Sequence, residues 1–183
     1  ENDLFELLDI IQKWDRKTDI DSQGAGLYGV LYYQLVRNYR GEIQKNNKTI
    51  SKEILLSALS DTKAYIINNF GSTKITLGDF QKLVRGDKEL PIWGLPDVIT
   101  AMSSRPYKDG KHKVTQGESY IGLVRFNENG PILESIISFG NSDNPESDHY
   151  TDQMEKYSKF QTKKMTFDKN IIYSEAKEIY NPN

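Results

Sequence analysis

The sequence predicts an α+β fold with a mainly helical first half, then a β-hairpin, then C-terminal helices. Apolar residues in the first half recur at the spacing of amphipathic helices, between short polar segments that suit helix caps. Two β-rich runs follow at 120–126 and 132–139, joined by a turn segment at 127–131. Polar starts and apolar periodicity then predict helices at 152–160 and after Asp168.

The first helix is expected over residues 3–14, where four apolar residues share one face: Leu4, Leu7, Leu8 and Ile11. The second is expected from Gly24 to about Arg40, after several candidate N-caps between Thr18 and Ser22. Each glycine costs a helix about 1 kcal/mol relative to alanine. The small residues at 24, 25, 26 and 29 therefore suit the close approach of another backbone, which would compensate that cost.

Two more helices complete the predicted helical half. Ser51 is expected to cap the third helix, and Gly71 to end it. Thr76 and Asp79 resemble a capping box. The fourth, short helix would then end at Gly86, and its apolar side would consist of Phe80, Leu83 and Val84.

Composition changes at Leu90. Pro91 and Pro96 exclude a regular helix, so residues 90–96 are expected to form an ordered loop that anchors Trp93 against the core. Asp109-Gly110 marks a turn.

The two strands of the hairpin carry apolar residues at adjacent as well as alternate positions, as Leu123 and Val124 illustrate. A strand that is apolar on both faces is buried on both faces. A lone hairpin cannot provide that burial, so these strands are expected inside a layered sheet. No other convincing strand pair is evident in the sequence, and the remaining strands are expected to come from elsewhere.

Apolar spacing and capping residues also predict the two C-terminal helices. In the helix at 152–160, we expect Met154, Tyr157 and Phe160 to face inward. Asp168 is expected to cap the last helix, whose apolar residues are Ile171, Ile172, Ala176 and Ile179. Asn181-Pro182-Asn183 would end it.

Charge and composition exclude several classes of function. The 183 residues carry 24 basic and 26 acidic side chains without a basic stripe, so a nucleic-acid partner is not expected. No apolar run reaches the roughly 18 residues of a membrane span. The absence of cysteine excludes disulfides, thiolate nucleophiles and cysteine-based zinc sites.

The segment from Gly140 to Gln153 gathers the residue types of a hydrolase triad in Ser147, Asp148 and His149. Sequence neighbours seldom form a triad, because the base must reach the nucleophile from a separate element, and no Gly-x-Ser-x-Gly elbow is present. We therefore expect a structural turn whose short polar side chains bond its own backbone. Its histidine would make one hydrogen bond, and Gly140 would adopt a positive φ.

Three other patterns were weighed as sites. His112, between two lysines near a turn, is expected to be exposed, and its distance from His149 argues against a transition-metal site. The set Asp143, Asp148 and Asp152 lacks the spacing of an EF-hand loop, and Asp152 is better explained as a helix-start residue. The glycines at 24–29 lack the preceding strand of a dinucleotide-binding loop.

Several motifs nonetheless resemble one family. Trp14-Asp15, Ser22 and Ala25-Gly26-Leu27-Tyr28 look like the tryptophan-aspartate stretch and following helix of the penicillin acylase family. Gly117-Glu118-Ser119-Tyr120 then leads into a strand. The family's C-terminal signature is resembled, in the same order, by Gly140-Asn141-Ser142, Asn144-Pro145, Ser147, His149-Tyr150 and Asp152-Gln153.

The chain departs from the family's pattern at three places. Members often have Gly-Gln-Ser where Asn141 is the middle residue here, and Ser-Pro-His where Asp148 is the middle residue. Arg16 replaces a common glycine after Trp-Asp. These differences indicate a divergent branch.

The resemblance implies an N-terminal nucleophile hydrolase with a layered αββα core, in which a Ser, Thr or Cys at the start of the β chain attacks an amide carbonyl. Because the chain begins at Glu1 and the resemblance starts well inside the family's β chain, we expect a C-terminal piece of that β chain. Its parts would be a helical part at 1–89, a loop and hairpin part at 90–151 and C-terminal helices at 152–183. The nucleophile and the oxyanion hole would lie upstream, so no catalytic, cofactor-binding or metal residue is assigned to this chain.

The resemblance also implies the partners and the location. The partners would be the remainder of the acylase and a small acyl amide substrate, and the parent enzyme would be periplasmic or secreted. The alternative, from another class of protein, is a non-catalytic α+β binding or scaffold module.

Overall fold

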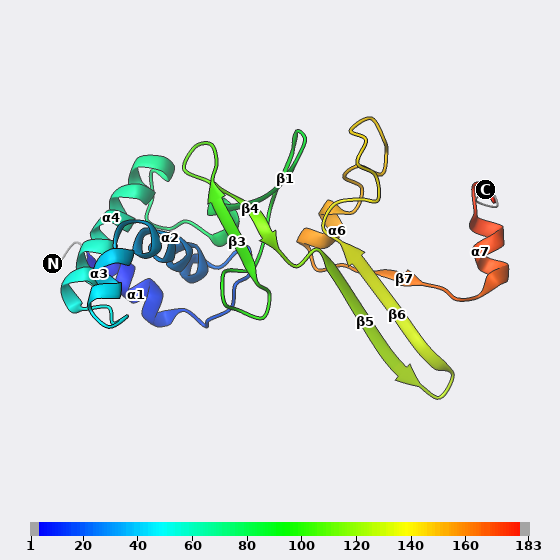
Figure 1. Cartoon of the computed structure of the whole chain (residues 1–183), viewed down its shortest axis with the longest axis horizontal. Helices are drawn as coiled ribbons and strands as arrows, with labels where there is room; N and C mark the ends of the chain where they lie inside the picture. The colour runs from blue at the N-terminus through cyan, green and yellow to red at the C-terminus, as the bar shows by residue number, and fades with distance from the viewer. Residues whose placement is uncertain (1–3, 180–183) are drawn as a thin grey trace. The chain divides into compact units, whose positions relative to one another are not determined.

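The computed structural model describes residues 4–179, which form two compact units that divide after Glu118. Helices and two small β-sheets occur among them, which confirms the predicted α+β class (Figure 1). The first unit contains five helices and a four-stranded sheet, and the second contains a three-stranded sheet with two short helices.

Local capping residues set the helices of the first unit. These are α1 (Phe5–Lys13), α2 (Gln23–Asn38), α3 (Arg40–Lys45), α4 (Lys52–Phe70) and α5 (Leu77–Phe80). The Ser22 and Ser51 side chains cap α2 and α4 by accepting N–H donors three residues on, and Gly71 ends α4 in the left-handed conformation at φ 71°. Thr76 and Asp79 form the predicted capping box. The predicted second helix is interrupted at Tyr39, after which α3 begins.

The helices bury an apolar core cluster to which α5 and the loop after β2 contribute, and a smaller cluster of Leu31, Ala58 and Leu59. The buried members of the larger cluster include Leu7 of α1, Leu27 and Val30 of α2, Ile66 of α4, and Phe80. Gly26 explains why small residues begin α2, because a Cβ there would lie 2.5 Å from the backbone carbon of Thr76. The predicted close approach of another backbone is therefore confirmed.

The sheet of the first unit corrects the prediction for residues 81–117. Its strands are β1 (Gln81–Arg85), β2 (Lys88–Pro91), β3 (Met102–Pro106) and β4 (His112–Gly117), in the order β2-β1-β4-β3. β1 pairs antiparallel with β2 and parallel with β4, and β3 pairs antiparallel with β4. The predicted helix up to Gly86 was wrong beyond Phe80, and so was the expectation of a single strand pair.

The physical reason is that the spacing of positions 80, 83 and 84 suits a helix, whereas the chain from Gln81 onward follows the two-residue period of a strand. Gln81 and Leu83 are buried on the same side of β1, as alternation requires, and the Gln81 amide donates to the carbonyl of Gly94 at 2.8 Å. That bond joins the strand to the loop at 92–101, in which Trp93 is 2% exposed. The predicted anchoring of this tryptophan is confirmed, as is the Asp109-Gly110 turn, where both residues have positive φ.

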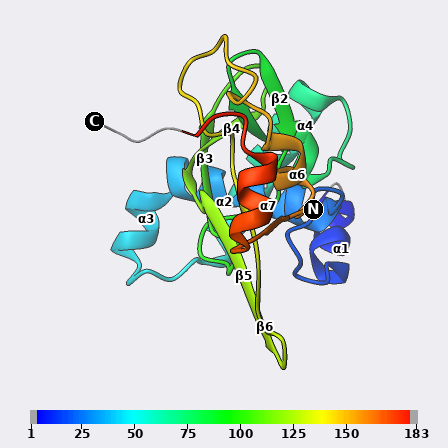
Figure 2. The same cartoon turned by 90° about the vertical axis from the view of Figure 1, so that its right-hand side faces the viewer.

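The second unit is built on the predicted hairpin of β5 (Tyr120–Asn127) and β6 (Gly130–Ile137), which Figure 2 shows as a long two-stranded ribbon. A short strand that the sequence did not reveal, β7 (Lys163–Met165), pairs antiparallel with β6. Within the described residues β5 pairs with β6 alone and is largely exposed, with Phe126 83% exposed.

The C-terminal helices α6 (Met154–Ser158) and α7 (Lys169–Glu175) confirm the predictions in part. Met154 and Tyr157 are buried as expected, whereas Phe160 lies beyond the end of α6 and is 48% exposed. The Asp168 side chain caps α7 as predicted, accepting the N–H of Asn170 at 2.8 Å. The helix ends before Ala176 and Ile179, and its described residues are exposed. The predicted ending at 181–183 lies outside the described residues.

Candidate functional site

The loop at 140–153 satisfies its own backbone, as predicted. The Ser142 hydroxyl accepts the N–H of Asn144 at 3.1 Å, and the Asn144 side chain accepts the N–H of Glu146 at 3.0 Å. Backbone bonds also join Ser142 to His149 and Gln153 to Phe139. These bonds close the loop at its base, where β6 leads toward α6.

The same loop does not assemble the triad that its residue types suggest. The Ser147 hydroxyl accepts the backbone N–H of His149 at 3.2 Å, whereas the His149 ring bonds Asp152, with Nδ1 and Oδ2 3.0 Å apart. The one predicted hydrogen bond of this histidine is thus confirmed, and within residues 4–179 no hydrogen bond or ion pair joins Asp148 to either residue. The predicted role of Asp152 was wrong, because α6 has Gln153 as its N-cap residue.

Gly140 also differs from its prediction, because its φ is not positive. Its backbone instead passes so close to the carbonyl of His149 that a Cβ would overlap that oxygen. Glycine is therefore required here by space and not by backbone conformation.

Trp14 and Asp15 likewise have structural contacts. The Trp14 indole N–H donates to the carbonyl of Lys17 at 2.7 Å, and the Asp15 carboxylate accepts the N–H of Lys17 at 3.0 Å. The ring packs on Gly24, where a Cβ would overlap it, and lies 5.3 Å from the ring of Tyr28. The glycines at 24–29 lie inside α2 and pack against other elements, so they form no phosphate-binding loop.

The prediction that His112 is exposed was wrong. This histidine is 5% exposed, with its ring centroid 4.6 Å from that of Tyr33 and 4.5 Å from that of Phe80. Its Nδ1 lies 3.3 Å from the Ser104 hydroxyl, and the Tyr33 oxygen accepts the N–H of Ser104 at 2.7 Å. Burial, and then the positive charge of Arg37, lower the pKa of His112 to about 4, so its ring is neutral at physiological pH.

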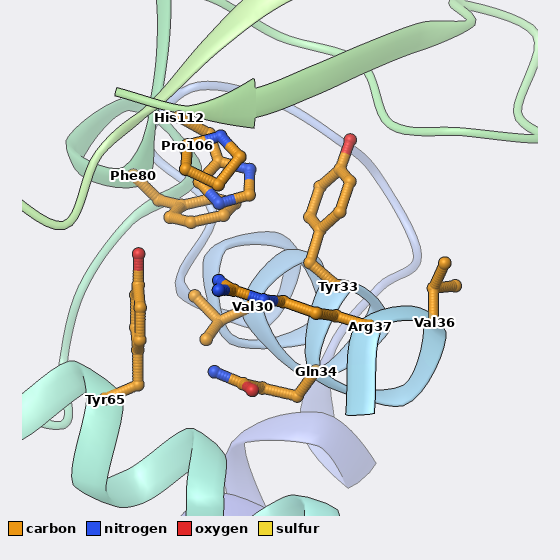
Figure 3. A pocket seen from close by; sticks show the side chains of 9 residues that line it. All are labelled: Val30, Tyr33, Gln34, Val36, Arg37, Tyr65, Phe80, Pro106 and His112. Carbon is orange, nitrogen blue, oxygen red and sulfur yellow. The ribbon is translucent and has the colours of Figure 1, made fainter. Parts of the chain in front are cut away.

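This histidine borders a half-open cavity of about 160 Å³ in the first unit (Figure 3). The cavity is lined mainly by apolar and aromatic side chains of α2, α4, α5, β3 and β4. A strand reading of the sequence could have found this histidine, because Lys111 and Lys113 flank it and alternation would then turn it inward. His112 was instead predicted to be exposed because it lies close to the turn at Asp109-Gly110.

Within residues 4–179, no group of three or more His, Cys, Asp or Glu side chains could hold a metal ion. Over the same residues, no helix has the length and apolarity that a bilayer crossing demands. The structure is thus an α+β chain in which the motif residues described above stabilise the loop at 140–153 and the packing of Trp14 on α2.

Comparison with known proteins gives the family of this chain. The family model described as penicillin amidase matches residues 1–173. The chain belongs to the penicillin amidase family, as its motifs indicated.

Named relatives in pseudomonads agree. The chain is 38% identical, over 92% of its own length and 24% of the relative's, to "Acyl-homoserine lactone acylase PvdQ" of Pseudomonas savastanoi pv. phaseolicola. It is 39% identical to the protein of the same name in Pseudomonas syringae pv. syringae, over 52% of the chain and 13% of the relative. The protein of that name in Pseudomonas fluorescens (strain Pf0-1) is 34% identical over 60% of the chain and 14% of the relative. The chain thus spans about a quarter of the length of the first of these acylases.

Proposed function

We propose that this chain is the C-terminal portion of the β chain of an amidohydrolase, and that the parent enzyme cleaves a linear acyl amide. The nucleophile would be a Ser, Thr or Cys at the start of that β chain, upstream of Glu1, with its own α-amino group as the base. The observation that carries the proposal is a family match over residues 1–173 in a chain that spans 24% of a named acylase. An N-acyl homoserine lactone is the first substrate to test, because the relatives are named for that activity.

The open edge and the exposed apolar side chains of the hairpin support the proposal. β5 leaves its second edge open within the described residues, and its side chains Leu123 and Val124, which point to opposite faces, are 50% and 52% exposed. An open edge with apolar side chains on both faces invites pairing with further strands. In the proposed parent, the rest of the acylase supplies those strands and completes a layered αββα core. A periplasmic or secreted location, which the family resemblance implied, is part of the proposal.

The test is reconstitution. Residues 1–183 are produced alone, and also together with the rest of the parent acylase, and hydrolysis of N-acyl homoserine lactones and penicillins is followed by mass spectrometry. We expect turnover only in the presence of both parts. Replacing the upstream nucleophile should abolish it, and the double variant Ser147→Ala, His149→Ala should keep it.

Two results would contradict the proposal. One is turnover by the chain alone that disappears in the Ser147→Ala, His149→Ala variant. The other is a stable monomer that neither binds the remainder nor contributes to its activity, which would favour the non-catalytic binding module.

A further inference from the structure

The cavity of the first unit contains a positive charge that no acidic side chain of the described residues pairs with. Arg37 projects from α2 into the space between Tyr33 and Tyr65, below Phe80 and His112 (Figure 3). Within residues 4–179, Arg37 forms no ion pair or hydrogen bond, and the residue is exposed. The cation is therefore solvated and available to a ligand.

The charge acts on the groups that surround the cavity. Arg37 lowers the pKa of His112 and opposes the burial that raises the pKa of Tyr65. The Tyr65 hydroxyl donates to the carbonyl of Gly110 at 2.9 Å, and it is thereby held in place as one wall. Because His112 is neutral at physiological pH and Arg37 is the cation among the lining residues, Arg37 gives the cavity a positive charge.

The volume of the cavity and its lining side chains determine which ligands fit it. A volume of about 160 Å³ matches the roughly 150 Å³ apolar cavity that accommodates a benzene ring in a well-studied case. Phe80, Val30 and the two tyrosine rings offer the apolar and aromatic surface that a planar ring prefers. An arginine at the edge of such a pocket recognises a carboxylate through paired N–H donors.

We propose that this cavity is a binding site for a small aromatic carboxylate, with its ring against Phe80 and Tyr65 and its carboxylate on Arg37. The site requires no residue of the second unit and no catalytic group. It therefore stands independently of the reaction that the parent enzyme performs.

The experiment measures fluorine NMR line broadening of 4-fluorobenzoate, on the full-length protein that contains this chain. The neutral 4-fluorobenzyl alcohol and the cationic 4-fluorobenzylamine serve as ligand controls. Arg37→Gln is the test variant. Arg40→Gln is the matched control, because Arg40 is an exposed arginine at the start of α3 and does not line the cavity.

We expect 4-fluorobenzoate to bind about tenfold more tightly than the alcohol, as a charge-assisted hydrogen bond allows, and the amine to bind least. Arg37→Gln should remove the preference for the carboxylate, and Arg40→Gln should retain it. Equal binding of the three ligands, or a carboxylate preference that survives in Arg37→Gln, would overturn the proposal. Absence of binding in the full-length protein would also overturn it, and would point to an acidic side chain of that protein as the occupant.

Discussion

Mild acid should destabilise the first unit through the single buried histidine of β4. The pKa of His112 is lowered to about 4 in the folded chain, first by burial and then by the charge of Arg37, against about 6.5 in an unfolded chain. The unfolded state therefore binds the proton more readily than the folded state. Above pH 6.5 both states are neutral and the histidine has no effect, and the loss of stability grows as the pH falls from 6.5 to 4.

The magnitude follows from the two pKa values. The difference between the two pKa values corresponds to a loss of roughly 3 kcal/mol well below pH 4. At pH 5 the expected loss is about 2 kcal/mol. That is a large share of the 5–15 kcal/mol that typically stabilises a domain.

Urea unfolding at pH 7.5 and pH 5 measures this loss. Trp14 and Trp93 are the two tryptophans of the chain, and both precede Glu118, so tryptophan fluorescence reports the first unit alone. His112→Gln should remove about 2 kcal/mol of the pH-dependent loss, whatever it costs at pH 7.5. The matched control, His149→Gln, replaces the exposed histidine of the second unit and should leave the fluorescence-detected loss unchanged. The reasoning is refuted if the unaltered chain and His112→Gln show the same difference between the two pH values.

Two further predictions concern glycines. Gly26→Ala should lower the free energy of unfolding by about 2 kcal/mol, because a Cβ would lie 2.5 Å from the Thr76 backbone. Gly41→Ala is the control in α3, where nothing lies within 4 Å of a Cβ, and it should raise the free energy of unfolding by about 0.5–1 kcal/mol. Equal effects of the two substitutions in urea titrations would contradict this account. Gly140→Ala should accelerate amide hydrogen exchange across residues 140–153, because the added carbon would displace the carbonyl of His149. Unchanged exchange would show that the loop can move aside without loss.

The capping residues could be predicted from the sequence because each bonds a backbone N–H only two or three residues further on. Ser22, Ser51 and Asp168 each accept a backbone N–H close by in the chain, so their pattern survives without knowledge of the fold. The hairpin was predictable for a similar reason, since its strands are joined by a short turn rich in Asn and Gly.

The first sheet could not be read in this way, because its pairings are not local. β1 lies between β2 and β4, and its pairing with β4 joins Gln81 to His112 across the intervening loop and strands. β3 (Met102–Pro106) is short and polar, so neither periodicity nor β-propensity identified it. Alternation around His112 is a local sign of its inward position, but the cavity also needs side chains that the fold brings together from α2, α4 and β3. That arrangement is not contained in the sequence pattern.

Arg16 shows how a departure from the family's pattern can be tolerated. It has a φ of 67°, the left-handed conformation that glycine adopts freely, which explains the glycine common at this place. For an L-residue that conformation costs about 1–2 kcal/mol. The Arg16 guanidinium lies 5.8 Å from the centre of the Trp14 ring, and an exposed cation–π contact returns about 0.5–1 kcal/mol. The net cost is therefore small, and the arginine leaves the indole bond to Lys17 and the contact with Gly24 in place. In this chain the Trp14-Asp15 motif is thus held by its packing on Gly24 and by its hydrogen bonds to Lys17.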